Sequence, residues 1–227
     1  MMHRELDDVS EALNGLDYRQ VRPLRPGVYG ILVLTVKDKD GRVVERRVQR
    51  TRSPTQWFFV WLLIGTLKSC VSTPMQTTTP PTSTSTSSNS LCANCGNACW
   101  TTEYNQLAST YIIVGSGTQS NPYTAGTLAA PIGTSVVTYG NPSYSSSVAT
   151  SGSEAYFVVT ETITNKSSST ITISEIGIFL EVIWLYTGSN SSYGPYWIMV
   201  WYDALSSPVS VGSGQSLTIT YTFTANP

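Results

Sequence analysis

The order of apolar and polar residues along the second half of the chain predicts a domain made mainly of β-strands. In residues 217–224, apolar side chains at odd positions alternate with threonines, which is typical of a strand with one buried face and one face covered by hydroxyl groups. In residues 170–182, the apolar positions change phase at Ser174–Glu175, which predicts a β-bulge. Other strand-like runs lie at residues 110–114, 134–139, 154–164 and 196–202. Short strands separated by turns favour a mainly β fold, an antiparallel β-sandwich or jelly roll, over residues 101–227.

The first half of the chain predicts a different kind of module, which we place at residues 1–71. Apolar residues at three- and four-residue steps within residues 1–18 indicate a short amphipathic segment. Two β-branched runs, 28–37 and 42–50, flank a turn that ends in Asp40-Gly41 and so predict a β-hairpin. The second run is rich in arginine. Such a basic strand is either a solvated face or a contact for a polyanion or an acidic neighbouring subunit.

An apolar helix is expected after the hairpin. Residues 53–56, Ser-Pro-Thr-Gln, fit a capping box with proline at the first helical position. The body that follows, residues 57–64, is apolar on every side, so it is buried in protein, at a subunit interface or in lipid. The apolar run 57–67 has 11 residues, whereas a bilayer span needs about 20. Burial is therefore favoured, with membrane contact through 57–67 as the alternative, and the candidate assembly residues here are Trp57, Phe58 and Trp61.

A tract of serine, threonine and proline begins the segment 72–100, which is predicted to be an extended stalk between the two modules. Three cysteines, Cys92, Cys95 and Cys99, follow the tract, and Cys70 precedes it. A metal site would need all four cysteines, because the chain has a single histidine. Disulfides formed in an oxidising compartment are the favoured interpretation, and four cysteines allow three pairings. No metal or other cofactor is expected.

The chemistry of the chain argues against an enzyme, and no catalytic residue is expected. His3 is the one histidine and lies in an N-terminal segment that is expected to be mobile, so no Ser-His or Cys-His pair is expected. A pair of carboxylates could serve a glycosidase, but each acid of the β domain is more simply a strand or turn residue; these acids are Glu154, Glu161, Glu175, Glu181 and Asp203. The net charge of -1 does not suggest a specific nucleic acid as a partner.

An aromatic cluster near residue 200 could stack on sugars or bases, but core packing and subunit contact are the favoured roles. Its candidate interface residues are Tyr196, Trp197 and Trp201. Asn165 and Asn190 begin glycosylation sequons in predicted loops.

Four segments resemble virion structural proteins of phages and archaeal viruses. Residues 171–179 and 207–223 are similar to the closing strands of such proteins, 114–118 match their vGtGt turn, and 129–132 match a later Ala-Ala-Pro-Ile. The resemblance implies a capsid, tail or spike subunit, located in the virion or outside the cell. Its implied partners are further copies of itself and other virion proteins, with a host-surface glycan as an additional candidate. The alternative is a membrane-anchored surface protein or adhesin with a Ser/Thr stalk and a β-sandwich binding head.

Overall fold

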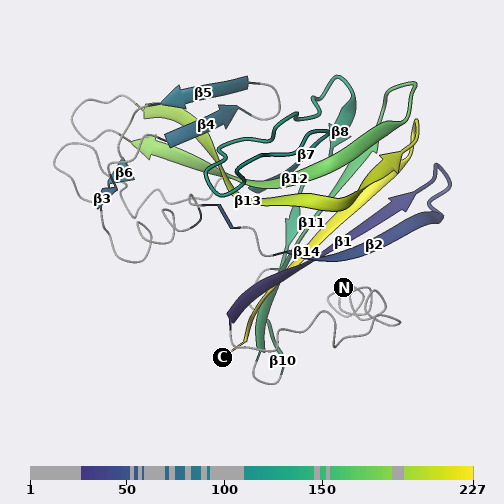
Figure 1. The fold of residues 1–227 in the computed structure, drawn as a ribbon, viewed down its shortest axis with the longest axis horizontal. Helices are drawn as coiled ribbons and strands as arrows, with labels where there is room; N and C mark the ends of the chain where they lie inside the picture. The colour runs from purple at the N-terminus through teal and green to yellow at the C-terminus, as the bar shows by residue number, and fades with distance from the viewer. Residues whose placement is uncertain are drawn as a thin grey trace.

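The fold of this chain, seen in a computed structural model, is mainly β. Its strands form two large antiparallel sheets and one separate pair of two-residue strands. The two large sheets lie face to face over part of their area and diverge at one end (Figure 1). The structure describes residues 27–51, 54, 55, 58, 70–71, 75–79, 83–87, 91–92, 110–145, 149–151, 154–185 and 192–226.

Sheet A combines strands from both ends of the chain. Its strand order is β10-β11-β14-β1-β2, and β8 and β9 also pair with β11. The bounds are β1 Gly27–Lys37, β2 Val43–Thr51, β8 Val137–Tyr139, β9 Ser143–Tyr144, β10 Ala149–Ser151, β11 Glu154–Asn165 and β14 Ser216–Asn226. The predicted N-terminal hairpin, β1–β2, is confirmed, and β1 pairs with β14 along its whole length. The boundary expected between the hairpin and the β domain therefore does not separate two sheets.

Sheet B has the order β5-β4-β13-β12-β7. Its strands are β4 Met75–Thr79, β5 Ser83–Ser87, β7 Thr110–Gly115, β12 Ile171–Leu185 and β13 Ser192–Val211. The segment predicted as an extended stalk thus contains the β4–β5 hairpin, which joins sheet B where Thr78 lies opposite Trp197. Threonine is well suited to strands, so this tract can form a ladder in which Met75 is the one apolar residue. The third sheet pairs β3, Cys70–Val71, with β6, Leu91–Cys92.

Several local predictions agree with the structure and others differ in extent. The bulge is confirmed, because the β12–β13 register shifts between Ile173 and Glu175. In β14 the predicted apolar face is buried. The strand expected at 134–139 is confined to residues 137–139, since 134–136 form a turn. Strand β13 is longer than the predicted run 196–202 and continues to residue 211.

One core fills the space between the sheets. Sheet A contributes the alternate apolar residues of β1, β11 and β14, and sheet B contributes those of β7, β12 and β13. Each fully buried aliphatic side chain stabilises the fold by about 1.5–3 kcal/mol. The largest fully buried apolar residues include Leu32, Ile112, Ile163, Ile173, Leu217 and Ile219.

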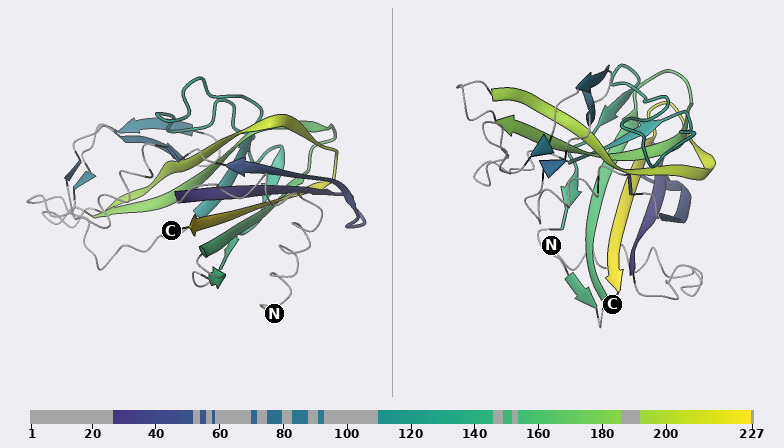
Figure 2. Two further views of the ribbon diagram at one scale, coloured as in Figure 1. Left: turned by 60° about the horizontal axis from the view of Figure 1, so that its bottom comes forward. Right: turned by 60° about the vertical axis from the view of Figure 1, so that its left-hand side comes forward.

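A second apolar cluster covers the opposite face of sheet B. The connection after β7 places Ala125 and Leu128 against Phe179 and Met199 of the sheet, and Figure 2 shows this connection lying over β12 and β13. Gly177 permits the close approach, since a Cβ there would lie 2.8 Å from Met199 Sδ and 3.0 Å from Leu128 Cδ2. Sheet B is therefore buried on both faces in this region.

The predicted apolar helix lies largely outside the described residues. Within it, Pro54 forms an isolated bridge with Trp201, and the Thr55 amide donates to the Val200 carbonyl at 3.0 Å. Phe58 packs against the main core. In the part of the chain that the structure describes, no helix is long and apolar enough to cross a membrane.

Candidate functional site

A row of aromatic rings runs from the core between the sheets to the surface. Phe58 meets Trp201 edge to face at 6.0 Å, and Trp201 meets Phe223 at 4.8 Å. Phe223 stacks on Tyr221 at 5.6 Å and on Phe157 at 4.9 Å. We call these five residues the aromatic row.

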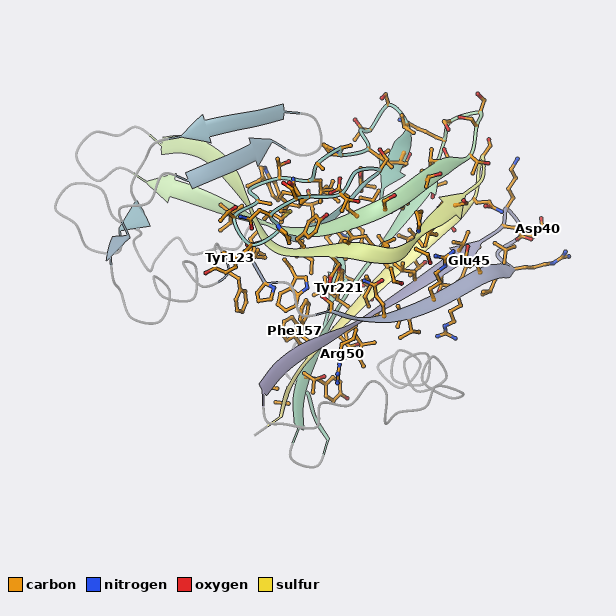
Figure 3. All side chains as sticks on the ribbon, viewed as in Figure 1. Asp40, Glu45, Arg50, Tyr123, Phe157 and Tyr221 are labelled. Atoms are coloured by element: carbon orange, nitrogen blue, oxygen red, sulfur yellow. The ribbon has the colours of Figure 1, made fainter. Side chains whose placement is uncertain are left out.

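The exposure of the rings changes sharply along the aromatic row. Trp201 is 4% exposed, whereas Phe157 is 42% exposed. The register places Phe157 of β11 directly opposite Phe223 of β14, and Figure 3 shows Phe157 farther from sheet B than Tyr221. The row therefore extends the core onto the end of sheet A that diverges from sheet B.

A buried carboxylate beside the aromatic row joins the two sheets. Asp203 of β13 accepts hydrogen bonds from the Thr51 hydroxyl and, at 2.9 Å, from the Tyr221 hydroxyl, both on sheet A. The Trp201 indole donates to Thr51 Oγ1 at 2.5 Å. Burial raises the pKa of Asp203 to about 7, although its hydrogen bonds with Thr51, Tyr221 and Trp201 lower it. Burial and the neighbouring Asp203 raise the pKa of Tyr221 well above its usual value.

Glu161 of β11 also connects the two sheets. Its Oε2 accepts a hydrogen bond from the Ile112 amide at 2.7 Å, and Ile112 lies on β7, the edge strand of sheet B. Nearby, the Tyr139 hydroxyl accepts from the Val114 amide at 3.4 Å. These side chains satisfy outward-facing groups of an edge strand, which would otherwise be open to pairing.

The surroundings of Glu161 favour its neutral form. It is 1% exposed, and its Oε1 has no hydrogen-bond partner among the described residues. Burial raises its pKa from the usual 4.5 to about 8, and the Ile112 hydrogen bond lowers it. Burial also raises the pKa of Tyr139, with smaller effects from the Val114 backbone, which lowers it, and from Glu161, which raises it.

Glu175 fixes the connection that covers sheet B. Its carboxylate accepts hydrogen bonds from the Ala129 amide at 3.0 Å and the Ala130 amide at 2.8 Å. At the start of the same connection, the backbone amide of Gln119 donates to the Tyr202 hydroxyl at 2.8 Å. Burial is the main cause of the raised pKa of Tyr202, and its contacts with Glu175 act in the same direction. The motifs at 114–118 and 129–132 therefore form the two ends of one anchored connection.

The basic strand β2 also contacts its own chain. Arg47 Nη1 donates to the Ser207 carbonyl at 2.8 Å and to its hydroxyl at 2.5 Å, while Arg47 Nε pairs with Glu45. Gln49 donates to the Ala204 carbonyl at 3.2 Å and accepts from the Ser206 amide at 3.1 Å. These bonds hold the irregular part of β13 against the edge of sheet A, so part of the predicted basic face has an internal structural role.

Three buried acids of the β domain hold different parts of the fold. Glu161, Glu175 and Asp203 bind different elements: β7, the connection after β7, and strands of sheet A. No group of three or more His, Cys, Asp or Glu residues suited to a metal ion occurs in the described ranges. The burial of Glu161 could have been predicted from the sequence. Alternate residues of a strand lie on the same face, so Glu161 shares a face with the buried residues Val159 and Ile163.

The predicted interface residues have mixed locations. Trp197 and Trp201 are 9% and 4% exposed and belong to the chain's own core. Phe58 begins the aromatic row, and Tyr196 lies opposite Val182 in the β12–β13 ladder. Trp57 and Trp61 lie outside the described residues. Phe157, the exposed end of the row, was not identified from the sequence.

Asn165, which begins one of the predicted glycosylation sequons, has a structural role in the fold. It is fully buried, and its Nδ2 donates to the carbonyls of Ser169 and Val211, both at 2.8 Å. A glycan on Nδ2 would disrupt this arrangement. Among the other predicted sites, Cys70 and Cys92 lie opposite each other in β3–β6, whereas Asn190, Cys95 and Cys99 lie outside the described residues.

Comparison of the chain with protein-family models, curated protein sequences and solved structures gives no match.

Proposed function

We propose that this protein is a structural subunit of a virus particle, a capsid, tail or spike component that assembles with further copies of itself. In this proposal the two sheets form an antiparallel β-sandwich of the jelly-roll type. The proposal rests on the resemblance of residues 171–179 and 207–223 to virion proteins and on one structural observation, the exposed end of the aromatic row.

The exposed end of the aromatic row is suited to a contact between copies. Phe157 is 42% exposed and stacks on Phe223, which is 7% exposed. Aromatic residues are enriched at protein interfaces, and their energetically important contacts lie where water is excluded. A second copy packed here would extend the existing core, because the aromatic row is continuous from Phe157 to Trp201.

The interior of the fold supports a structural rather than a catalytic role. The carboxyl groups of Glu161, Glu175 and Asp203 all accept hydrogen bonds that hold strands or the connection after β7. Such side-chain bonds between separate elements favour one well-defined packing of the sheets. A subunit that repeats in a particle needs this constancy of shape.

The size of the expected contact follows from the exposure of Phe157. A phenylalanine side chain offers roughly 200 Å², so its 42% exposure corresponds to roughly 80 Å² of apolar surface. At about 25 cal/mol per Å², its burial contributes about 2 kcal/mol to each contact. Removing it should weaken association between copies about thirtyfold.

The test compares Phe157→Ser with Tyr123→Ser. Tyr123 is 54% exposed but lies in the connection after β7, which packs on the face of sheet B opposite the main core. Light scattering over a concentration series is expected to show assembly by the native chain and by Tyr123→Ser, but weaker assembly by Phe157→Ser. Circular dichroism and thermal unfolding would establish that both variants are folded. Equal assembly by the two variants would contradict the proposed contact, and a native monomer that needs detergent to stay in solution would instead favour the anchored surface protein.

A further inference from the structure

Two cysteines that are distant in sequence lie opposite each other in the fold. Strands β3 and β6 pair antiparallel, with Cys70 opposite Cys92 and Val71 opposite Leu91. Directly opposed residues of antiparallel strands have Cα atoms about 4.5–5.5 Å apart. Disulfides usually join residues with Cα atoms about 4.4–6.8 Å apart. The backbone register therefore satisfies the main distance requirement for a disulfide.

The segment between these cysteines is itself paired. It contains the β4–β5 hairpin, whose strands pair over residues 75–79 and 83–87. Strand β4 also joins β13, where Thr78 lies opposite Trp197. A covalent bond at β3–β6 would close the base of this segment and restrict the chain entropy of a tract with few apolar residues.

We propose that Cys70 and Cys92 form a disulfide that closes the Ser/Thr-rich segment between them. Four cysteines allow three sets of two pairs, and the register selects the set that contains Cys70–Cys92. Cys95 and Cys99 are then left as the second pair. Formation of the bond converts two thiols into one disulfide and transfers two electrons and two protons to a disulfide of an oxidising compartment, which is reduced to two thiols. This proposal is independent of what the protein assembles into.

The sequence allows the pairing to be tested by chemical cleavage. No lysine or arginine lies between Lys68 and Lys166, so trypsin leaves all four cysteines in one peptide. Cyanogen bromide cleaves after Met75, which separates Cys70 from the other three cysteines. The fragments on either side of Met75 can therefore remain joined only through a disulfide of Cys70.

The experiment uses the full chain secreted into an oxidising compartment, cleaved without reduction and analysed by mass spectrometry. Three forms are compared: the native chain, Cys92→Ser, and the double variant Cys95→Ser/Cys99→Ser. We expect the fragments to stay joined in the native chain and in the double variant, and to separate in Cys92→Ser. The double variant is the control, because it loses two thiols, one more than Cys92→Ser, but retains the proposed pair.

Two results would overturn the proposal. Fragments that stay joined in Cys92→Ser would mean that Cys70 pairs with Cys95 or Cys99. Fragments that separate in the native chain would mean that Cys70 forms no disulfide within the chain, and one zinc ion per chain in elemental analysis would then identify the cysteines as metal ligands. Iodoacetamide labelling of the unfolded, unreduced native chain should modify no cysteine if both proposed disulfides are present.

Discussion

The replacement Glu161→Gln should remove a large part of the pH dependence of folding stability. In the native fold, Glu161 Oε2 accepts the Ile112 amide hydrogen bond, and burial raises the pKa of the carboxyl to about 8. Glutamine is nearly isosteric, carries no charge and retains a carbonyl that can accept the same hydrogen bond. It therefore resembles the protonated glutamic acid at every pH.

The sign of the effect follows from proton uptake. Between the usual pKa of 4.5 and about 8, folded Glu161 is protonated and the unfolded group is not. The free energy of unfolding should therefore be highest below pH 4.5 and fall as the pH rises, by about 1 kcal/mol per pH unit from this group. Burial raises the pKa of Asp203 from 3.8 to about 7. This group therefore also lowers the free energy of unfolding as the pH rises between these two values. Above pH 7 the fall is expected to come mainly from Glu161.

Urea unfolding between pH 5 and 8, followed by tryptophan fluorescence, measures this effect. The native chain should lose stability throughout the range, whereas Glu161→Gln should show a shallower fall below pH 7 and little fall from pH 7 to 8. Asp40→Asn, which changes an exposed carboxylate at the β1–β2 turn (Figure 3), is the control and should follow the native curve. An unchanged pH dependence in Glu161→Gln would refute the reasoning that burial holds this carboxyl neutral.

Two further predictions concern other parts of the interior. Tyr221→Phe removes the hydroxyl that donates to Asp203 and should lower the free energy of unfolding by about 1–3 kcal/mol; an unchanged urea midpoint would show that this hydrogen bond adds nothing. Gly115→Ala would place a Cβ against the Glu175 carboxylate and 2.8 Å from the Ala130 carbonyl, so its thermal midpoint should fall by several degrees. Gly41→Ala is the control for this variant. It adds a Cβ in open space, and the φ of +81° at this position should lower the free energy of unfolding by about 1 kcal/mol. A larger loss of stability in Gly41→Ala than in Gly115→Ala would contradict this account of the connection after β7.

The parts of the fold that could be predicted from the sequence are those with a local signal. The alternation in residues 217–224 identifies β14 and its buried face, the turn at Asp40-Gly41 identifies the first hairpin, and the phase change at Ser174–Glu175 locates the bulge. Each signal comes from residues that are close in sequence. The pairing of β1 with β14 has no such signal, so the sequence suggested two modules where one sheet is shared.

The candidate site depends on contacts between residues that are far apart in sequence. Arg47 binds Ser207, and Thr51 binds Asp203, across more than 150 residues. Their roles were therefore not predictable from spacing along the chain. Phe157 gave no distinct signal either, because its exposure depends on where sheet B ends.

Electron microscopy of the purified native protein, in negative stain and without detergent, tests the central claim most directly. A virion subunit of the proposed kind should form regular particles, rings or filaments as its concentration rises. A protein that remains monomeric at every concentration, or that requires mild detergent to stay in solution, would contradict the proposed function.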